Sequence, residues 1–270
     1  MKRVPNIKHT NMNETLEKMK AVIDAIAERG SILIAFSGGV DSSVLARVAK
    51  ESGANVLAVT ADSELLGRRG LRDAIRMADE IGINHEIFDF EILRKKEFVE
   101  NPHNRCYHCK KHLILELAKI ASRNSIKTVA DGTNITDIAG DRPGYAAIKD
   151  AGVFTPFVDF GLGKPEIREI ARHYGLSVAD TPSESCLATR IPSGTEITVK
   201  RLSRIEEAES MLRSQGFCGV RVRDHGRLAC VEVQSGDAER FRVVQEDVAA
   251  VFARIGFDRA VLSGLRSGTL

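Results

Sequence analysis

A short apolar run near the N-terminus leads directly into a glycine-rich turn and then into a helical pattern. The run is SILIAF at residues 31–36, the turn is SGGVDSS at 37–43, and helical periodicity extends from Asp41 to Glu51. Two glycines let the backbone turn sharply, and the free N–H groups at the start of a helix attract anions. The arrangement predicts a phosphate-binding loop between a strand and a helix of an α/β fold.

The first two thirds of the chain alternate between short runs rich in β-branched residues and longer amphipathic stretches. This alternation is typical of a doubly wound, mostly parallel sheet with helices packed on it. Further strands are expected at Asn55–Thr60, His85–Phe90 and Thr128–Ala130, and in VFTPFV at 153–158.

The pattern changes near Thr181, where DTPSESCLATRIPSGTEIT carries turn-forming residues at almost every third position. Beyond it, the order helix, two strands, helix and strand predicts a smaller α+β domain. We therefore expect an α/β domain with the phosphate-binding loop over residues 1–180 and an active-site linker over 181–189. An α+β domain for substrate binding or oligomerisation is expected over 190–270.

Composition and charge exclude several classes of protein. The chain has 39 Lys and Arg against 37 Asp and Glu, so its overall charge favours neither nucleic acid nor an anionic membrane surface. No apolar run approaches the length of a membrane span, and the N-terminal residues lack the apolar region of a secretory signal. We expect a cytoplasmic protein without a membrane or nucleic-acid partner, in which anion binding is local.

Two later segments fit a phosphate site at the same sheet edge. Gly132 in DGTN follows a predicted strand, and Lys164 precedes a predicted helix, where its ammonium group could reach a phosphate. Taken alone, SGG is also compatible with an ordinary strand-to-helix turn, and Lys164 with a solvated lysine. The complete SGGVDSS string, however, resembles the PP-loop ATP pyrophosphatases. The resemblance implies adenylation of a substrate oxygen and ATP binding by Ser37, Gly38, Gly39, Asp41, Ser42, Gly132 and Lys164.

Three cysteines lie in segments of unusual composition. Cys106 and Cys109 form a CxxC pair in RCYHCKK, and Cys186 lies in ESCLATRIPSG. Such a pair can chelate a metal, form a redox disulfide or pack. A thioredoxin-like motif would start a helix directly after a strand, whereas NPHNR before the pair is loop-like. A zinc site would need a fourth ligand, with three histidines as candidates: His103, His108 and His112.

A closer resemblance rests on segments spread over almost the whole chain. The strings SGGVDSS, GINHEI, NPHNRCYHCKK, DGTN followed by RPG, ESCLATRIPSG, VRVRDHGRLACVEV and SGLRSG resemble the LarE family. Members of that family are sulfur transferases that build the nickel-pincer nucleotide. SGGVDSS specifies only the superfamily, whereas CLATRIP together with the basic VRVR hairpin is much more specific to the family.

The resemblance implies a small-molecule substrate, a pyridinium biscarboxylic acid mononucleotide. ATP with Mg2+ would adenylate one ring carboxylate, and a sulfur nucleophile would displace AMP. In one version of the family the cysteine equivalent to Cys186 is sacrificed, and in the other three cysteines hold a [4Fe-4S] cluster that supplies sulfide. Because Cys106, Cys109 and Cys186 are all present, we expect the cluster version, with these cysteines as ligands and catalytic residues. We also expect a homo-oligomer.

Four residues are expected to bind the substrate: Arg190, Glu209, Arg221 and Arg223. Arg221 and Arg223 alternate along one predicted strand and so face the same side, where they could hold the nucleotide phosphate; a solvated basic strand is the alternative. Glu209 follows from the resemblance, with a surface glutamate as the alternative. Cys218 and Cys230 are expected to pack in the core.

GTNITD departs from the family, which tends to have paired acids after GTN. The segment keeps Asp137 but has Thr136 before it, so Asp41 is the better candidate for the vicinity of Mg2+. Other functions remain open. A tRNA-thiolating PP-loop enzyme would need a basic surface, and an amide synthetase would need an ammonia source. A non-catalytic ATP or iron–sulfur sensor would bind without turnover.

Overall fold

The computed structural model describes residues 12–139, 142–182 and 184–266. Contacts divide the chain into two units. Unit 1 contains the chain up to Thr60 together with Asp73–Glu86 and Ile114–Thr181, and unit 2 contains Ala61–Arg72, Ile87–Leu113 and the chain from Pro182 onward. Ser183 of the predicted linker and the last two residues of SGLRSG lie outside the described residues.

The larger sheet contains the strand that precedes the phosphate loop. Its strands are β1 (Ser31–Ala35), β2 (Asn55–Asp62), β3 (Asn84–Asp89) and β4 (Val129–Ala130), in the order β3-β2-β1-β4. Strand β1 pairs in parallel with β2 and with β4. Its three central residues are fully buried, as expected for an interior strand with helices on both faces.

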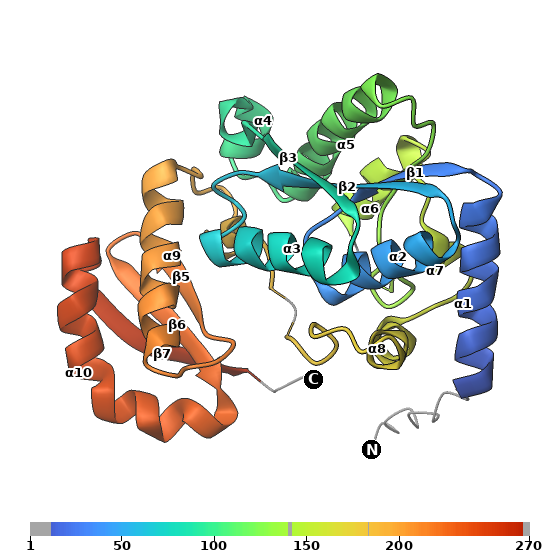
Figure 1. Ribbon diagram of the computed structural model, residues 1–270. Helices are drawn as coiled ribbons and strands as arrows, with labels where there is room; N and C mark the ends of the chain where they lie inside the picture. Colours follow the sequence, from blue (N-terminus) through green and yellow to red (C-terminus); the bar gives the residue numbers. More distant parts are fainter. Residues whose placement is uncertain (1–11, 140–141, 183, 267–270) are drawn as a thin grey trace, which may run out of the picture. The chain divides into compact units, whose positions relative to one another are not determined.

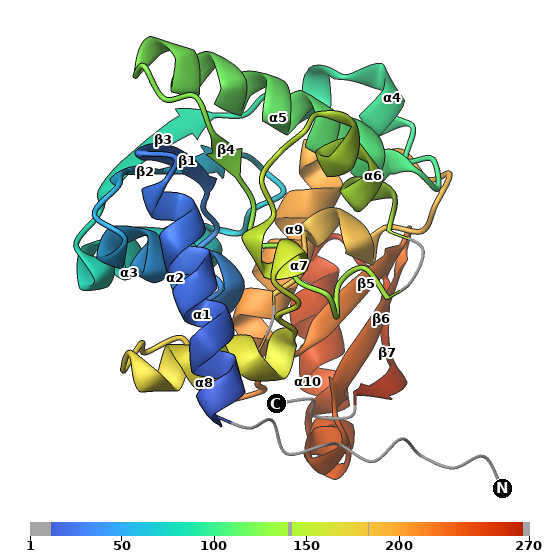
Figure 2. The ribbon, with the colours of Figure 1, turned by 90° about the vertical axis from the view of Figure 1, so that its right-hand side faces the viewer.

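The helices cover this sheet as a doubly wound fold requires. Figure 1 shows α2 (Val40–Glu51) and α3 (Arg68–Ile81) on one face and α5 (Arg105–Arg123) on the other. In Figure 2, α1 (Met12–Ala27) lies beside α2 and α8 (Lys164–His173), and the three helices contact one another. The order of the strands reverses direction between β1 and β4, so ligands are expected where these two strands end.

One predicted strand is wrong, and two short helices were not predicted. VFTPFV forms a single bridge from Phe154 to Ala130 and then the short helix α7 (Pro156–Asp159), because proline suits the first turn of a helix. Helix α5 begins at Arg105, so it includes the CxxC pair, and α4 (Lys96–Val99) and α6 (Pro143–Asp150) had not been expected. Within the described ranges, no helix combines the length and apolarity that crossing a membrane requires.

The C-terminal part of unit 2 has the predicted α-β-β-α-β order. Its elements are α9 (Val199–Ser214), β5 (Arg221–His225), β6 (Leu228–Gln234), α10 (Ala238–Ile255) and β7 (Arg259–Arg266). The β5–β6 hairpin is antiparallel, and β6 pairs in parallel with β7. Every second residue of β6 is buried, and the helices supply Leu212, Phe241 and Phe252 to the same core.

Candidate active site

The phosphate loop follows β1 directly and is closed by its own hydroxyl groups. Gly38 adopts the left-handed region at φ +70°, and Ser42 Oγ accepts from the N–H of Ser37 and donates to the carbonyl of Gly39. Gly39 is the N-cap of α2, and no side chain caps the helix there. The first amides of α2 are therefore available to an anion.

Two glycines allow close packing around this loop. A Cβ on Gly38 would lie 2.5 Å from the Cα of Ala74 in α3, and a Cβ on Gly132 would lie 3.1 Å from the backbone of Asp41. The segment after β4 thus reaches the start of α2 because residue 132 has no side chain. Gly39 has room for a Cβ, which would meet only Ser37 Oγ at 3.4 Å.

Asp41 and Lys164 meet beside the loop. The Lys164 ammonium donates to Asp41 Oδ2, and Asn134 Nδ2 donates to both Asp41 Oδ1, at 3.1 Å, and Asp137 Oδ2, at 2.7 Å. Burial raises the pKa of the Asp41 carboxyl, and Lys164 opposes that effect. Thr136 has a different contact, because its hydroxyl accepts from the N–H of Lys164 at 3.0 Å. Asn134 is a residue that the sequence analysis did not single out.

The donor set here suits a hard cation. The carboxylates of Asp41 and Asp137 both accept a hydrogen bond from the Asn134 amide. Carboxylate oxygens are the ligands that Mg2+ prefers. No group of three or more His, Cys, Asp or Glu side chains able to hold a metal ion by itself occurs in the part of the chain that the structure describes. The two carboxylates would therefore share the cation with phosphate oxygens and water.

Unit 2 brings together the three cysteines of the predicted triad. Cys106 and Cys109 are three residues apart in the first turns of α5, so they face the same side of the helix. Cys109 packs against a core cluster that includes Leu187, the residue after Cys186. The three thiols are also close enough to influence one another electrostatically.

Asn101 ties the two cysteine-bearing segments together, which the sequence analysis missed. It is fully buried, with φ at 55°, a conformation that asparagine tolerates better than most residues. Its amide donates to the carbonyls of Pro192 and Thr195, at 2.8 and 2.9 Å, just beyond Cys186. Its side-chain oxygen accepts from Arg105, at 2.7 Å, at the start of α5. The sequence signal that could have indicated this role is the asparagine directly before a proline in NPHNR.

The protein environment raises the pKa of two of these thiols, those of Cys109 and Cys186. Burial raises the pKa of Cys109 to about 12, with further increases from Cys186 and Cys106. Cys186 is exposed as a residue, yet desolvation by the protein around its sulfur still raises its pKa. Thiols with raised pKa values are poor nucleophiles until a metal ion replaces the proton.

We therefore expect slow alkylation of Cys109 in metal-free protein. Because only the thiolate reacts, the rate constant with iodoacetamide should rise about tenfold per pH unit from pH ~7 to ~10. Mass spectrometry of the Cys109 peptide measures this rate. A rate that stops rising below pH ~9 would contradict the raised pKa.

Arg190 and Glu209 form a buried ion pair. Their side chains are 6% and 1% exposed, and Arg190 Nε donates to Glu209 Oε1 at 2.8 Å. Arg190 also donates to the carbonyls of Ser185 and Cys186, at 2.9 and 3.3 Å, and Glu209 accepts from the N–H of Val222 at 3.0 Å. The pair thus joins the Cys186 turn to α9 and β5. Glu209 is not the surface residue that the alternative interpretation required.

The remaining predicted residues have varied surroundings. Arg221 and Arg223 lie on one side of β5, and Val222 between them in sequence is buried on the other side. Arg223 donates to Glu232 and to the carbonyl of Thr189. The prediction that Cys218 and Cys230 pack in the core is wrong. Cys218 is exposed in the turn before β5, and Cys230 is only partly buried because it lies on the face of β6 opposite the helices.

Removing the Glu209 carboxylate should destabilise unit 2. Glu209→Ala leaves Arg190 buried without its counter-charge, which typically costs about 3 to 5 kcal/mol. Urea denaturation of the wild type and the variant measures the loss. Glu207→Ala, at an exposed site on the same helix, is the control and should change stability by less than about 0.5 kcal/mol. Equal stability of the two variants would mean that the buried pair does not hold this region together.

The chain is similar in sequence to several known proteins. The family profile of "Queuosine biosynthesis protein QueC" matches residues 31–101, which include the phosphate loop. An uncharacterized protein of Synechocystis sp. is 36% identical over 260 residues, 94% of this chain and 96% of its own. The tRNA-specific 2-thiouridylase MnmA of Rickettsia rickettsii is 28% identical over 235 residues, 73% of this chain and 64% of its own.

A further relative has a specific biochemical name and similar length. The pyridinium-3,5-bisthiocarboxylic acid mononucleotide synthase of Lactiplantibacillus plantarum is 30% identical over 261 residues, 95% of this chain and 95% of its own. The phosphate loop and the cysteine segments both lie within this nearly full-length match. The chain therefore belongs to the LarE family and is an ATP-using sulfurtransferase of the PP-loop type.

Proposed function

We propose that this enzyme replaces carboxylate oxygen by sulfur on a pyridinium biscarboxylic acid mononucleotide, in the biosynthesis of the nickel-pincer nucleotide. The observation that carries the proposal is the convergence of Cys106, Cys109 and Cys186 in unit 2 of a chain whose unit 1 contains a PP-loop. The name of the Lactiplantibacillus relative supports the substrate.

The first step is adenylation. A carboxylate oxygen of the substrate attacks the α-phosphorus of ATP, a new P–O bond forms, and the bond to the bridging oxygen breaks, so that pyrophosphate leaves with the electron pair. The open amides of α2 would hold the phosphates where Gly38 and Gly39 let the backbone approach. Lys164 and Mg2+ near Asp41 would neutralise the charge that develops on pyrophosphate.

The second step is displacement of AMP. The sulfur of a hydrosulfide attacks the carbonyl carbon of the acyl adenylate, the C–O bond to AMP breaks, and AMP leaves with the electron pair. The hydrosulfide proton passes to solvent, and a thiocarboxylate remains. Adenylation is required because a free carboxylate has no leaving group.

We assign the cysteine triad as the ligand set of a cluster, although the three side chains as placed do not form a group that could hold a single metal ion. Cys106, Cys109 and Cys186 supply three soft thiolates that would bind three irons of a [4Fe-4S] cluster. Such a cluster, when bound, supplies an exchangeable sulfide at its iron without a protein ligand. Asn101 and Arg190 would hold the two cysteine-bearing segments in place through their hydrogen bonds.

The substrate would be held by residues of unit 2. Arg221 and Arg223 lie on one side of β5, where their guanidinium groups would bind the anionic groups of the substrate. The buried pair of Arg190 and Glu209 would position the Cys186 turn. We further propose residues 1–180 as the ATP-binding part, 181–189 as the linker with Cys186, and 190–270 as the substrate-binding part of a homo-oligomer. A cytoplasmic location is part of the same proposal.

The test is the set of products. Protein purified without oxygen is incubated with ATP, Mg2+, sulfide and the pyridinium biscarboxylic acid mononucleotide, and the nucleotides are separated and weighed by mass spectrometry. One AMP and one pyrophosphate are expected for each oxygen replaced by sulfur. In a parallel incubation, tRNA replaces the mononucleotide. Formation of ADP, or thiolation of tRNA in place of the mononucleotide, would contradict the proposal. The match to MnmA motivates the tRNA arm, although it covers less of the chain.

A further inference from the structure

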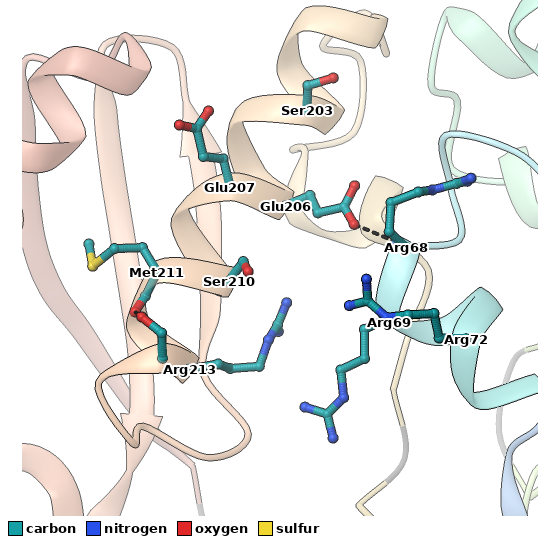
Figure 3. Close-up of a pocket in the computed structure, with 10 residues that line it drawn as sticks. Arg68, Arg69, Arg72, Ser203, Glu206, Glu207, Ser210, Met211 and Arg213 are labelled. Atoms are coloured by element: carbon teal, nitrogen blue, oxygen red, sulfur yellow. Dashed lines mark hydrogen bonds between the residues drawn. The ribbon is translucent and has the colours of Figure 1, made fainter. Parts of the chain in front are cut away.

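A second concave site lies within unit 2. It is a cavity of about 890 Å³ lined by the first turn of α3 and by one face of α9. Figure 3 shows Arg72 and Arg213 pointing into it from these two walls. The volume is in the range of pockets that hold a small organic ligand.

Arginine side chains line both walls of the cavity. Arg69 and Arg72 are three residues apart on α3, so their like charges are neighbours, and the Arg69 contact with Glu184 is long, at 3.8 Å. In the described part of the chain, no hydrogen bond or ion pair joins Arg72 to another residue. Arg213 keeps one contact, with Glu209 at 3.2 Å. An anion between the walls would relieve this repulsion, and guanidinium groups match phosphate oxygens in geometry.

The α9 wall adds groups that suit a sugar. Ser203, Glu207 and Ser210 lie on one side of the helix at helical spacing and line the cavity. Among the described residues, Glu207 has no partner. The negative charge of Glu207 would repel a simple anion such as inorganic phosphate. Its carboxylate oxygens can, however, accept hydrogen bonds from ribose hydroxyls. A ligand with both a phosphate and a ribose satisfies both kinds of group.

The walls are held in place independently of any ligand. Glu206 Oε1 accepts from the backbone N–H of Arg68, at 2.5 Å, and so caps the start of α3 from α9. The N–H of Leu187 donates to the carbonyl of Leu65 at 3.1 Å, which connects the segment before α3 to the Cys186 turn. The cavity is therefore adjacent to the turn that carries Cys186.

We propose that this cavity is a further nucleotide site, which binds a ribose mononucleotide through Arg72, Arg213 and Arg69 at its phosphate and through Glu207 at its ribose. It goes beyond the proposed function, which places nucleotide binding at the phosphate loop and on β5. Two sources share this chemistry, the pyridinium mononucleotide substrate and the AMP that the reaction releases.

Isothermal titration calorimetry tests the site with nicotinic acid mononucleotide and, separately, with AMP. The phosphate loop is first saturated with a non-cleavable ATP analogue, so that it does not contribute to the signal, and dependence on Arg72 distinguishes the cavity from β5. Wild-type protein should bind at least one probe, and Arg72→Ala should weaken that binding about tenfold or more. Arg242→Ala is the matched control. Arg242 is an exposed arginine of α10 paired with Glu239 outside the cavity, and its loss should leave binding unchanged.

Glu207→Gln supplies a second readout. The wild type should prefer the ribose form of the better probe over its deoxyribose form, and the variant should lose most of that preference. The tighter probe identifies the source. No binding of either probe, or equal affinities for wild type and Arg72→Ala, would overturn the inference. Equal weakening by Arg72→Ala and Arg242→Ala would also overturn it. Because no sulfur is transferred, the result is independent of the proposed reaction.

Discussion

Asp41→Asn should reduce ATP cleavage by a factor on the order of 10²–10³. The substitution keeps the size of the side chain but removes the charge that pairs with Lys164 and lies near the proposed Mg2+. Since burial already raises the pKa of Asp41, loss of this buried charge should not weaken folding. Pyrophosphate release, measured with an enzyme-coupled assay, reports the effect, and the thermal midpoint should stay near that of the wild type.

Asp79→Asn provides the control for that experiment. Asp79 is an exposed carboxylate of unit 1 on α3, outside the loop region, so its loss should leave pyrophosphate release unchanged. If Asp41→Asn released pyrophosphate at the wild-type rate, the phosphate loop would not be the ATP site.

Cys186→Ala should abolish thiocarboxylate formation while pyrophosphate release continues. The residues expected to bind ATP all lie in unit 1, whereas Cys186 lies in unit 2, so adenylation and sulfur delivery can be separated by mutation. Cys186 is exposed as a residue, and replacement by alanine removes only its sulfur atom. Product analysis by mass spectrometry should show AMP and pyrophosphate without a sulfur-containing nucleotide.

Cys218→Ala is the matched control, because Cys218 is an exposed cysteine of the same unit. It should retain full activity and, after anaerobic reconstitution, the iron content of the wild type. Replacement of Cys106, Cys109 or Cys186 should remove most of the iron. Unchanged iron in all three variants would contradict the cluster, and wild-type product from Cys186→Ala would exclude this cysteine as a participant.

The parts of the site that are local in sequence could be predicted. The phosphate loop depends on a strand, two glycines and a helix start within a few residues, and Gly38 has the positive φ that this turn needs. The doubly wound sheet followed from alternating patterns, and the structure confirms it. The VFTPFV strand was wrong because Pro156 starts a helix, which a strand-like composition does not reveal.

The parts that depend on distant partners could not be predicted. The position of Arg190 shortly after Cys186 suggested a phosphate ligand. In the structure Arg190 is buried in an ion pair with Glu209, which lies on a different element. Asn101 and Asn134 hold segments together through amide hydrogen bonds whose acceptors are remote in sequence. Composition and spacing give no register between such segments, so only the folded chain shows these contacts.

The sulfur source can be followed directly with isotopically heavy sulfide. The enzyme is reconstituted without oxygen and incubated with ATP, Mg2+, the pyridinium biscarboxylic acid mononucleotide and an excess of heavy sulfide. Product and the Cys186 peptide are then weighed by mass spectrometry. We predict several products per enzyme, heavy sulfur in all but the first, one AMP for each sulfur, and an unmodified Cys186. Light sulfur in a single product, with dehydroalanine at position 186, would contradict delivery from a replenished sulfide and show that the cysteine itself is consumed.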